Sequence, residues 1–378
     1  MPIRPPRLSP ALPDRPGSSA ADSRDLGHDP GRRALLRHGA AGAVGLTIWV
    51  KSGGVAAQDK RLVIRDPGGP FAEGFGAAFY KPFREATGIE IVPATGQHQP
   101  TAFIKTMVES KAYTWDMAHV SRDVHDALLG MGHLEPLNLD AALSELPAAY
   151  RAPTYAGVDV VGSVLAYRSD KMPAGKAPRT FADLWDVKTF PGRRALRRNP
   201  METLEFALLA DGVAPAQLYP LDLDRAFRAL ERVKKDIAVW WTSGAQTSQL
   251  LKSGEVDFCP TWNARAQVVA DEGTPVAIMW SQHLFTTEGW IIPKGAPKAD
   301  LCREFIKFAT DAKRQAEFTK HLSYGPTLPK AYDFVDAKRA RTFPAHPDNA
   351  RGGIEWNVGY WAKNRDAVTE RFNAWVTT

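Results

Sequence analysis

The strongest constraint on the fold is a regular alternation of short apolar runs and helical segments early in the folded chain. Apolar residues recur at helical spacing from Phe75 to Ala86, after a short run that stops at Pro67. Short Gly/Pro/Ser loops separate the elements, which is typical of a parallel α/β sheet. Ligands of such sheets bind at the carboxyl ends of strands, so loops 68–71, 95–97 and 121–123 are candidate binding loops. The predicted order is strand, helix, strand, helix, strand, over residues 61–66, 75–86, 89–93, 102–110 and 115–120.

A second set of elements predicts a second lobe. A strand at 163–168 leads into a linker at 173–178, and a return strand is expected at 289–293. Crossings near 165 and 287 give one lobe of residues 58–167 with 288–378, and a second lobe of residues 168–287. The remaining expected elements are helices at 181–187, 202–210, 222–235, 264–270, 299–320 and 366–376, and strands at 239–241 and 256–260.

Residues 1–57 are predicted to be a leader with a signal peptide. Twin arginines, Arg32 and Arg33, precede a weakly apolar stretch at 39–50, and a small-residue site ends at Ala57. This order is typical of export by the twin-arginine route, with cleavage near Ala57 and a periplasmic product. The apolar core has about twelve residues, whereas a membrane span needs about 20. An amphipathic surface helix is the alternative interpretation, and translation could begin after residues 1–30.

Composition narrows the class of partner. The 378 residues carry a net charge of +6, of which the leader accounts for +4, so the folded body is close to neutral. Such a body offers no concentrated basic face, and we expect no nucleic-acid partner. Two cysteines, Cys259 and Cys302, make no disulfide framework and could either pair or remain free thiols.

No motif for catalysis or for a cofactor is found. The chain has no Gly-x-Ser-x-Gly elbow and no phosphate-binding Gly-rich loop, and its histidines are not spaced for zinc. We therefore expect no enzyme activity, no cofactor and no metal. A hydrolase that uses acidic residues remains the alternative from a different class, although the sequence supplies no nucleophile for it.

Four short motifs in order carry a family likeness: Val239–Gln246, Gly254–Asp257 with Thr261–Ala266, Trp290–Ala296, and Tyr324–Thr327. From about residue 60 to the end, the chain resembles periplasmic substrate-binding proteins of ABC importers, in the polyamine (spermidine/putrescine) group. The resemblance implies two α/β lobes, joined by hinge crossings, with a ligand cleft between them. It further implies a monomer that delivers a small-molecule ligand to permease subunits.

The resemblance also implies ligand contacts. Glu202 and Glu288 match carboxylates that hold amines, and Trp262 matches a tryptophan that lies against the methylene chain. At three positions the chain departs from the family pattern, with Asn199, Thr286 and Asp123, the last of which adds a carboxylate. Phe71 and Trp241 are candidates from their loop and strand positions. The full set of predicted ligand-binding residues is Phe71, Ser121, Asp123, Glu202, Trp241, Trp262, Glu288 and Asn357.

These residue types favour a small cationic solute, a polyamine or a related amine. A desolvated ammonium needs a carboxylate partner, and an alkyl chain needs an aromatic face. Glu202 also has a purely structural interpretation, as an acid at a helix N-terminus. The alternative ligand is an anion or a metal chelate, held by Ser243, Gly244 and Arg265.

Overall fold

The computed structural model describes residues 60–95 and 100–378. The predicted leader, its twin arginines and the cleavage site near Ala57 lie outside these residues, as does loop 95–97 apart from Thr95. Within the described residues, no helix combines the length and the apolar character that crossing a bilayer requires.

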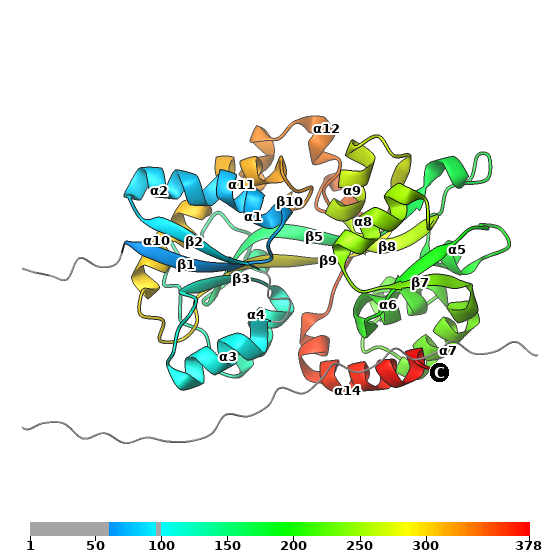
Figure 1. The fold of residues 1–378 in the computed structure, drawn as a ribbon, viewed down its shortest axis with the longest axis horizontal. Coiled ribbons are helices and arrows are strands. Elements are labelled where there is room, and N and C mark those ends of the chain that lie inside the picture. Colours follow the sequence, from blue (N-terminus) through cyan, green and yellow to red (C-terminus); the bar gives the residue numbers. More distant parts are fainter. Residues whose placement is uncertain (1–59, 96–99) are drawn as a thin grey trace, which may run out of the picture. The chain divides into compact units, whose positions relative to one another are not determined.

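One mixed sheet runs through the described residues in the order β2-β1-β3-β9-β5-β8-β6-β7 (Figure 1). β1 pairs in parallel with β2 and β3, as predicted, and β6 pairs in parallel with β7 and β8. Between these two parallel groups lie β5 and β9, which are antiparallel to each other and to their outer neighbours. The main strands are β1 (Arg61–Asp66), β2 (Glu90–Thr95), β3 (Met117–Ser121), β5 (Tyr155–Arg168), β6 (Arg194–Arg197), β7 (Ile237–Trp241), β8 (Phe258–Trp262) and β9 (Val276–Ile291), with β4 (Arg151–Ala152), β10 (Gly325–Pro326) and β11 (Gly353–Glu355) beside them.

β5 and β9 are the two crossings that the sequence predicted near 165 and 287. Both are longer than expected, because polar residues such as Asp159 and Glu288 interrupt their apolar pattern. Two glycines face each other on them, Gly157 and Gly289. A Cβ on Gly289 would lie 2.3 Å from the Ala156 carbonyl oxygen, so only glycine fits there. The pairing register shifts between Gly157 and Asp159, directly beside this glycine pair.

Helices cover both faces of the sheet, with α2, α8, α9 and α11 on one side and α3, α4, α6, α7 and α14 on the other (Figure 1). The predicted helix 75–86 is the end of a longer segment, in which a π-helical turn (Gly76–Tyr80) joins α1 to α2. The helices are α1 (Pro70–Phe75), α2 (Lys81–Thr87), α3 (Pro100–Ser110), α4 (Arg122–Gly130), α5 (Phe181–Trp185), α6 (Pro200–Ala210), α7 (Leu223–Val233), α8 (Gly244–Ser253), α9 (Asn263–Asp271), α10 (Ala299–Ala309), α11 (Ala312–Thr319), α12 (Ala337–Ala340), α13 (Pro347–Ala350) and α14 (Val358–Val376).

Caps explain several helix boundaries. Asp222 begins α7 by accepting a hydrogen bond from the Arg225 amide, and Ser243 begins α8 in the same way. The expected helix 299–320 is two helices, since Asp311 caps the N-terminus of α11 and so ends the run of α10. α14 starts eight residues before the predicted 366, with Asn357 as its cap.

Two large apolar clusters lie on the two parallel groups of strands. One contains Phe75, Trp290 and Phe305, and the other contains Leu230 of α7 together with Trp361 and Phe372 of α14. The division into lobes by residue number stays a prediction, but this packing groups α14 with the residues of the second lobe. Cys259 and Cys302 are buried free thiols.

Candidate functional site

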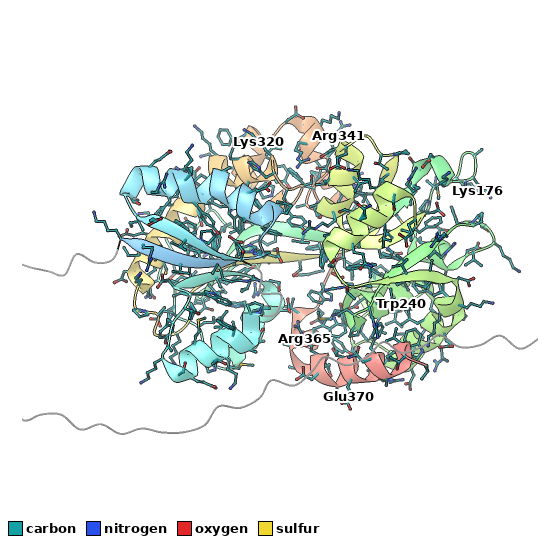
Figure 2. The ribbon with its side chains drawn as sticks, viewed as in Figure 1. Lys176, Trp240, Lys320, Arg341, Arg365 and Glu370 are labelled. Atoms are coloured by element: carbon teal, nitrogen blue, oxygen red, sulfur yellow. The ribbon has the colours of Figure 1, made fainter. Side chains whose placement is uncertain are left out.

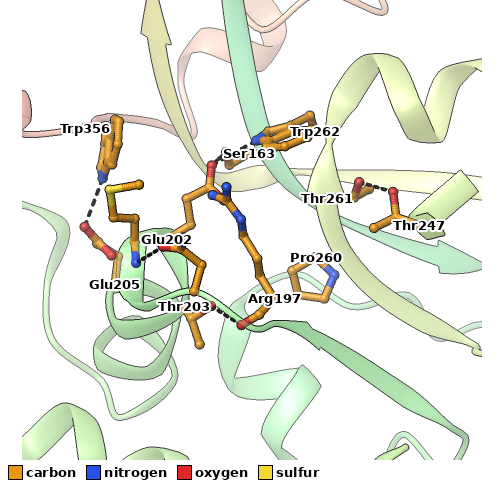
Figure 3. A network of polar contacts seen from close by, with 12 residues as sticks. Ser163, Arg197, Glu202, Thr203, Glu205, Thr247, Pro260, Thr261, Trp262 and Trp356 are labelled. Carbon is orange, nitrogen blue, oxygen red and sulfur yellow. Dashed lines mark hydrogen bonds and ion pairs between the residues drawn. The ribbon is translucent and has the colours of Figure 1, made fainter. Parts of the chain in front are cut away.

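Glu202 lies at the start of α6, and its carboxylate is the centre of a hydrogen-bonded network (Figure 3). Its Oε1 accepts from Ser163 Oγ at 2.5 Å and from Trp262 Nε1 at 3.0 Å. Its Oε2 accepts from Arg197 at 2.8 Å. The Glu202 backbone has φ 71° and ψ −43°, a strained γ-turn-like conformation that interrupts the first turn of α6. Both oxygens of Glu202 are therefore engaged by protein donors.

Arg197 connects this network to two tryptophans. Its guanidinium lies 5.6 Å from the ring centre of Trp241 and 5.1 Å from that of Trp262. Trp241 is fully buried, whereas Trp262 is half-buried and packs edge-on against it. Arg197 therefore neutralises Glu202 and also holds the ring of Trp262 in place.

Glu288 has a different environment, on the crossing strand β9. It is the register partner of Ser121 on β3 and of Asp159 on β5. Among the described residues, its half-buried carboxylate has no hydrogen-bond or ion-pair partner. Asp159 is fully buried, and its Oδ2 lies 3.5 Å from Nε2 of the fully buried His119.

Burial dominates the ionisation of this group. It raises the pKa of Asp159 well above its usual value. Burial, together with the charge of Asp159, raises the pKa of Glu288 to about 7. Burial lowers the pKa of His119 to about 4, so its imidazole is neutral at pH 7. The ligand atoms of these three side chains lie within 4.8 Å of one another, a separation compatible with a bound cation or with a shared proton.

Arg265 supplies a positive charge that has no partner among the described residues. It lies on α9, half-buried, and its guanidinium makes no hydrogen bond or ion pair with any residue that the structure describes. Gly244, the first residue of α8, allows it to lie close. A Cβ on Gly244 would stand 2.9 Å from Arg265 Nε and 2.8 Å from the Trp262 ring. Arg265, Trp262 and the N-terminus of α8 therefore form one surface.

Tyr324 lies between the environments of Glu288 and Arg265. It is buried, and its ring centre lies 5.5 Å from that of Phe71. Burial raises the pKa of its phenol above the usual value, and the charges of Glu288 and Asp159 add to the rise while Arg265 opposes it. The Tyr324 hydroxyl is therefore within electrostatic reach of both Glu288 and Arg265.

Other predicted site residues have structural partners. Asp123 is buried and forms an ion pair with Arg365 of α14, which Figure 2 labels. Asn357 is exposed, and its side-chain oxygen caps α14 by accepting from the Tyr360 amide at 2.8 Å. Ser121 ends β3 beside Glu288. For these residues a role in ligand binding stays a prediction, and their present contacts are with the protein.

Sequence reasoning missed Ser163, Arg197, His119, Asp159 and Tyr324. Tyr324 lay within one of the family motifs, which was a usable signal. His119 and Asp159 lie in strands among apolar residues, where the sequence does not distinguish a core position from a site position. Surface hollows occur elsewhere, one lined by residues of the 169–190 segment and one between α2 and α10–α11. Neither hollow is lined by Glu202, Glu288 or Arg265.

Comparison with known proteins places this arrangement in a family. Residues 78–345 match the family described as bacterial extracellular solute-binding protein. The gamma-aminobutyric acid-binding protein of Pseudomonas aeruginosa is 32% identical over 329 residues, which are 85% of this chain and 92% of that protein. The spermidine/putrescine-binding periplasmic protein of Escherichia coli is 22% identical over 281 residues, 70% of this chain and 78% of that protein.

A crystal structure of an ABC transporter substrate-binding protein from Bradyrhizobium japonicum USDA 110 has a TM-score of 0.79 and 37% sequence identity, and the match covers 83% of this chain and 99% of that one. These matches confirm the predicted two-lobe α/β fold and the prediction that the protein is not an enzyme. The chain belongs to the bacterial extracellular solute-binding proteins, the extracytoplasmic components that bind a small molecule and deliver it to an ABC transporter.

Proposed function

We propose that the protein captures a small solute with an ammonium group at one end and a carboxylate at the other, such as 4-aminobutyrate, and passes it to a permease. The observation that carries this proposal is a pair of unmatched charges. Glu288 and Arg265 are both half-buried and without partners among the described residues, and Tyr324 is within electrostatic reach of both. A half-buried charge without a partner is costly, and a zwitterion would neutralise both charges.

The carboxylate end of the solute would bind Arg265. A guanidinium presents a planar fork of donors that matches a carboxylate. The N-terminus of the ten-residue helix α8 adds favourable backbone dipoles beside it. Arg197 is less suited to this role, because Glu202 already neutralises it.

The ammonium end would bind Glu288, and the methylene chain would lie along aromatic side chains. Trp262 and Tyr324 offer apolar faces beside the two charged ends. Glu202 is less suited to an ammonium, since both of its oxygens already accept hydrogen bonds from protein donors and Arg197 neutralises its charge. This revises the expected role of Glu202 from ligand contact to support for Trp262.

A polyamine is the second candidate, supported by the distant spermidine/putrescine-binding relatives. It would leave Arg265 without a partner and add a positive charge near it. The relative that is 32% identical is named for gamma-aminobutyric acid, which carries both charges and so agrees with the first candidate.

Calorimetric titration of the mature protein with four probes of similar length tests the proposal. We expect 4-aminobutyrate to bind, and butylamine and butyrate to bind at least tenfold more weakly, because each lacks one charge. Putrescine matches 4-aminobutyrate in length and carries two ammonium groups. An affinity for putrescine that equals or exceeds the affinity for 4-aminobutyrate would contradict the proposal and favour a polyamine as the ligand.

We also propose that the leader directs export by the twin-arginine route, which would place the protein in the periplasm, as a monomer, after cleavage near Ala57. The double substitution Arg32→Lys with Arg33→Lys should leave the protein in the cytoplasm with its fold intact. Fractionation of the host cells measures this. Normal export of the double variant would indicate the general secretory route instead.

A further inference from the structure

A buried acid stands directly behind the proposed ammonium end. Asp159 faces Glu288 across neighbouring strands and lies 3.5 Å from His119. Neither oxygen of Asp159 and neither ring nitrogen of His119 has a hydrogen-bond partner in the described part of the chain. Rings of Phe71, Phe75 and Trp290, with centres 4.9–5.5 Å from that of His119, enclose the imidazole. The pair is therefore closed off on the side of the core and adjoins Glu288 on the other.

Two carboxylates that face each other across strands repel when both are ionised, and burial strengthens the repulsion. Such a pair lowers its free energy by retaining one proton, as coupled carboxylates do. The neutral imidazole of His119 carries no charge to offset the repulsion. The raised pKa values of Asp159 and Glu288 have the same direction as this geometric argument.

Charged and titratable groups from other elements surround the pair. Arg65 and Asp66 come from β1, Asp123 from α4, and Tyr155 and Tyr324 from β5 and from the segment before β10. Arg65 donates a hydrogen bond of 2.6 Å to the His119 backbone carbonyl, and its positive charge acts on Glu288. A divalent metal ion would have to sit beside this guanidinium, whereas a proton needs only the two carboxylates.

We propose that Asp159 is a positioning residue for solute binding: acting through Glu288, it retains one proton in the empty site, and the ammonium group of the solute displaces that proton. This rests on the proposed function, because it brings the ammonium to Glu288. The step breaks only the O–H bond of the carboxylic acid, and the proton leaves to solvent. Capture of one cation is thus an exchange for another, and both carboxylates are ionised in the complex.

The exchange predicts a pH dependence with a definite sign. Below about pH 7 the empty site holds the proton, so binding releases about one proton and affinity rises with pH by up to about tenfold per unit. Above that pH the site is already ionised and the affinity levels off. We expect 4-aminobutyrate to bind about 10- to 30-fold more tightly at pH 8 than at pH 5.5.

Calorimetry at pH 6 in two buffers of different ionisation enthalpy counts the released protons. We expect about one proton for the wild type and clearly fewer for Asp159→Asn, in which Glu288 stays buried but has no facing charge. The affinity of Asp159→Asn should rise less steeply than that of the wild type from pH 5.5 to 8, because only the part of the pKa shift caused by Asp159 is removed. Glu205→Gln is the matched control, since Glu205 is another fully buried acid with a raised pKa. On binding the solute, this variant should release as many protons as the wild type.

Circular dichroism first establishes that each variant is folded, and the wild-type proton count tests the exchange itself even if Asp159→Asn does not fold. Tight binding at pH 8 without proton release at pH 6 would overturn this inference and leave the proposed function standing. A stoichiometric metal ion in the purified protein, whose removal by a chelator abolishes the pH dependence, would also overturn it. No binding of 4-aminobutyrate at pH 8 would overturn both.

Discussion

Two carboxylates, Glu202 and Glu288, were predicted to hold the ligand, and the structure gives them opposite surroundings. Glu202 accepts hydrogen bonds from three side chains, including a guanidinium 2.8 Å away. Glu288 has no such partner among the described residues, and an acid of the same sign faces it. From this difference we infer that a carboxylate is suited to bind a ligand when its hydrogen-bonding capacity is unsatisfied, and that the number of carboxylates near a site is a poor guide.

The largest expected effect comes from Glu288→Gln. This change keeps the size of the side chain and removes the charge that we assign to the ammonium. Loss of one partner from a buried charge pair costs about 2–5 kcal/mol, or about 30- to several-thousand-fold in Kd. Titration with 4-aminobutyrate measures the loss. A change of less than about threefold would show that Glu288 is not a ligand contact.

Arg265→Gln should have the second largest effect, and the effect should depend on the solute. Hydrogen bonds to a charged group contribute about 1.5–3 kcal/mol, so 4-aminobutyrate should bind about 10- to 150-fold more weakly. Butylamine, which has no carboxylate, should be unaffected or improved. An equal loss for both solutes would indicate that Arg265 acts on the fold and not on the carboxylate.

Glu202→Gln should affect folding more than binding. The amide still accepts from Ser163 and Trp262, but Arg197 loses its charged partner. We expect the free energy of unfolding to fall by about 1–3 kcal/mol and the Kd to rise by less than about tenfold. Thermal melting and titration of the same sample separate the two. A loss of affinity as large as that of Glu288→Gln would reverse the comparison between these carboxylates.

The smallest effect concerns Glu205, one turn after Glu202 on α6. Tyr219, Trp356 and Trp361 all donate to its Oε1, and burial raises its pKa to about 7. Between its unfolded pKa near 4.3 and about 7, the folded protein keeps a proton that the unfolded chain has lost, so stability falls as pH rises through this window. Glu205→Gln should flatten this fall when melting is followed from pH 5 to 7.5. An unchanged slope would mean that Glu205 does not retain the proton.

Much of the fold could be predicted from the sequence, because apolar periodicity and turn residues report local structure directly. The strand–helix order of residues 61–120 and the crossings near 165 and 287 are examples. Trp262 and Glu202 were predicted as neighbours of one ligand, and they do contact each other. Their partner Ser163 could not be predicted, since it lies 39 residues from Glu202 and meets it only through the pairing of β5 with β8. The same holds for Asp159, which β9 brings opposite Glu288.

The facing glycines, Gly157 and Gly289, bear on how new specificities arise in such proteins. A side chain at Gly289 would collide with the neighbouring backbone, and Gly289 directly follows Glu288. We expect few substitutions to be tolerated along this stretch of the crossing strands, so the end of the site that we propose for the ammonium should change little among relatives. Arg265 and Trp262 lie on other elements, at a helix and a strand end, and can change independently. Related proteins could then keep the recognition of an amine and diversify in the group at the opposite end of the solute.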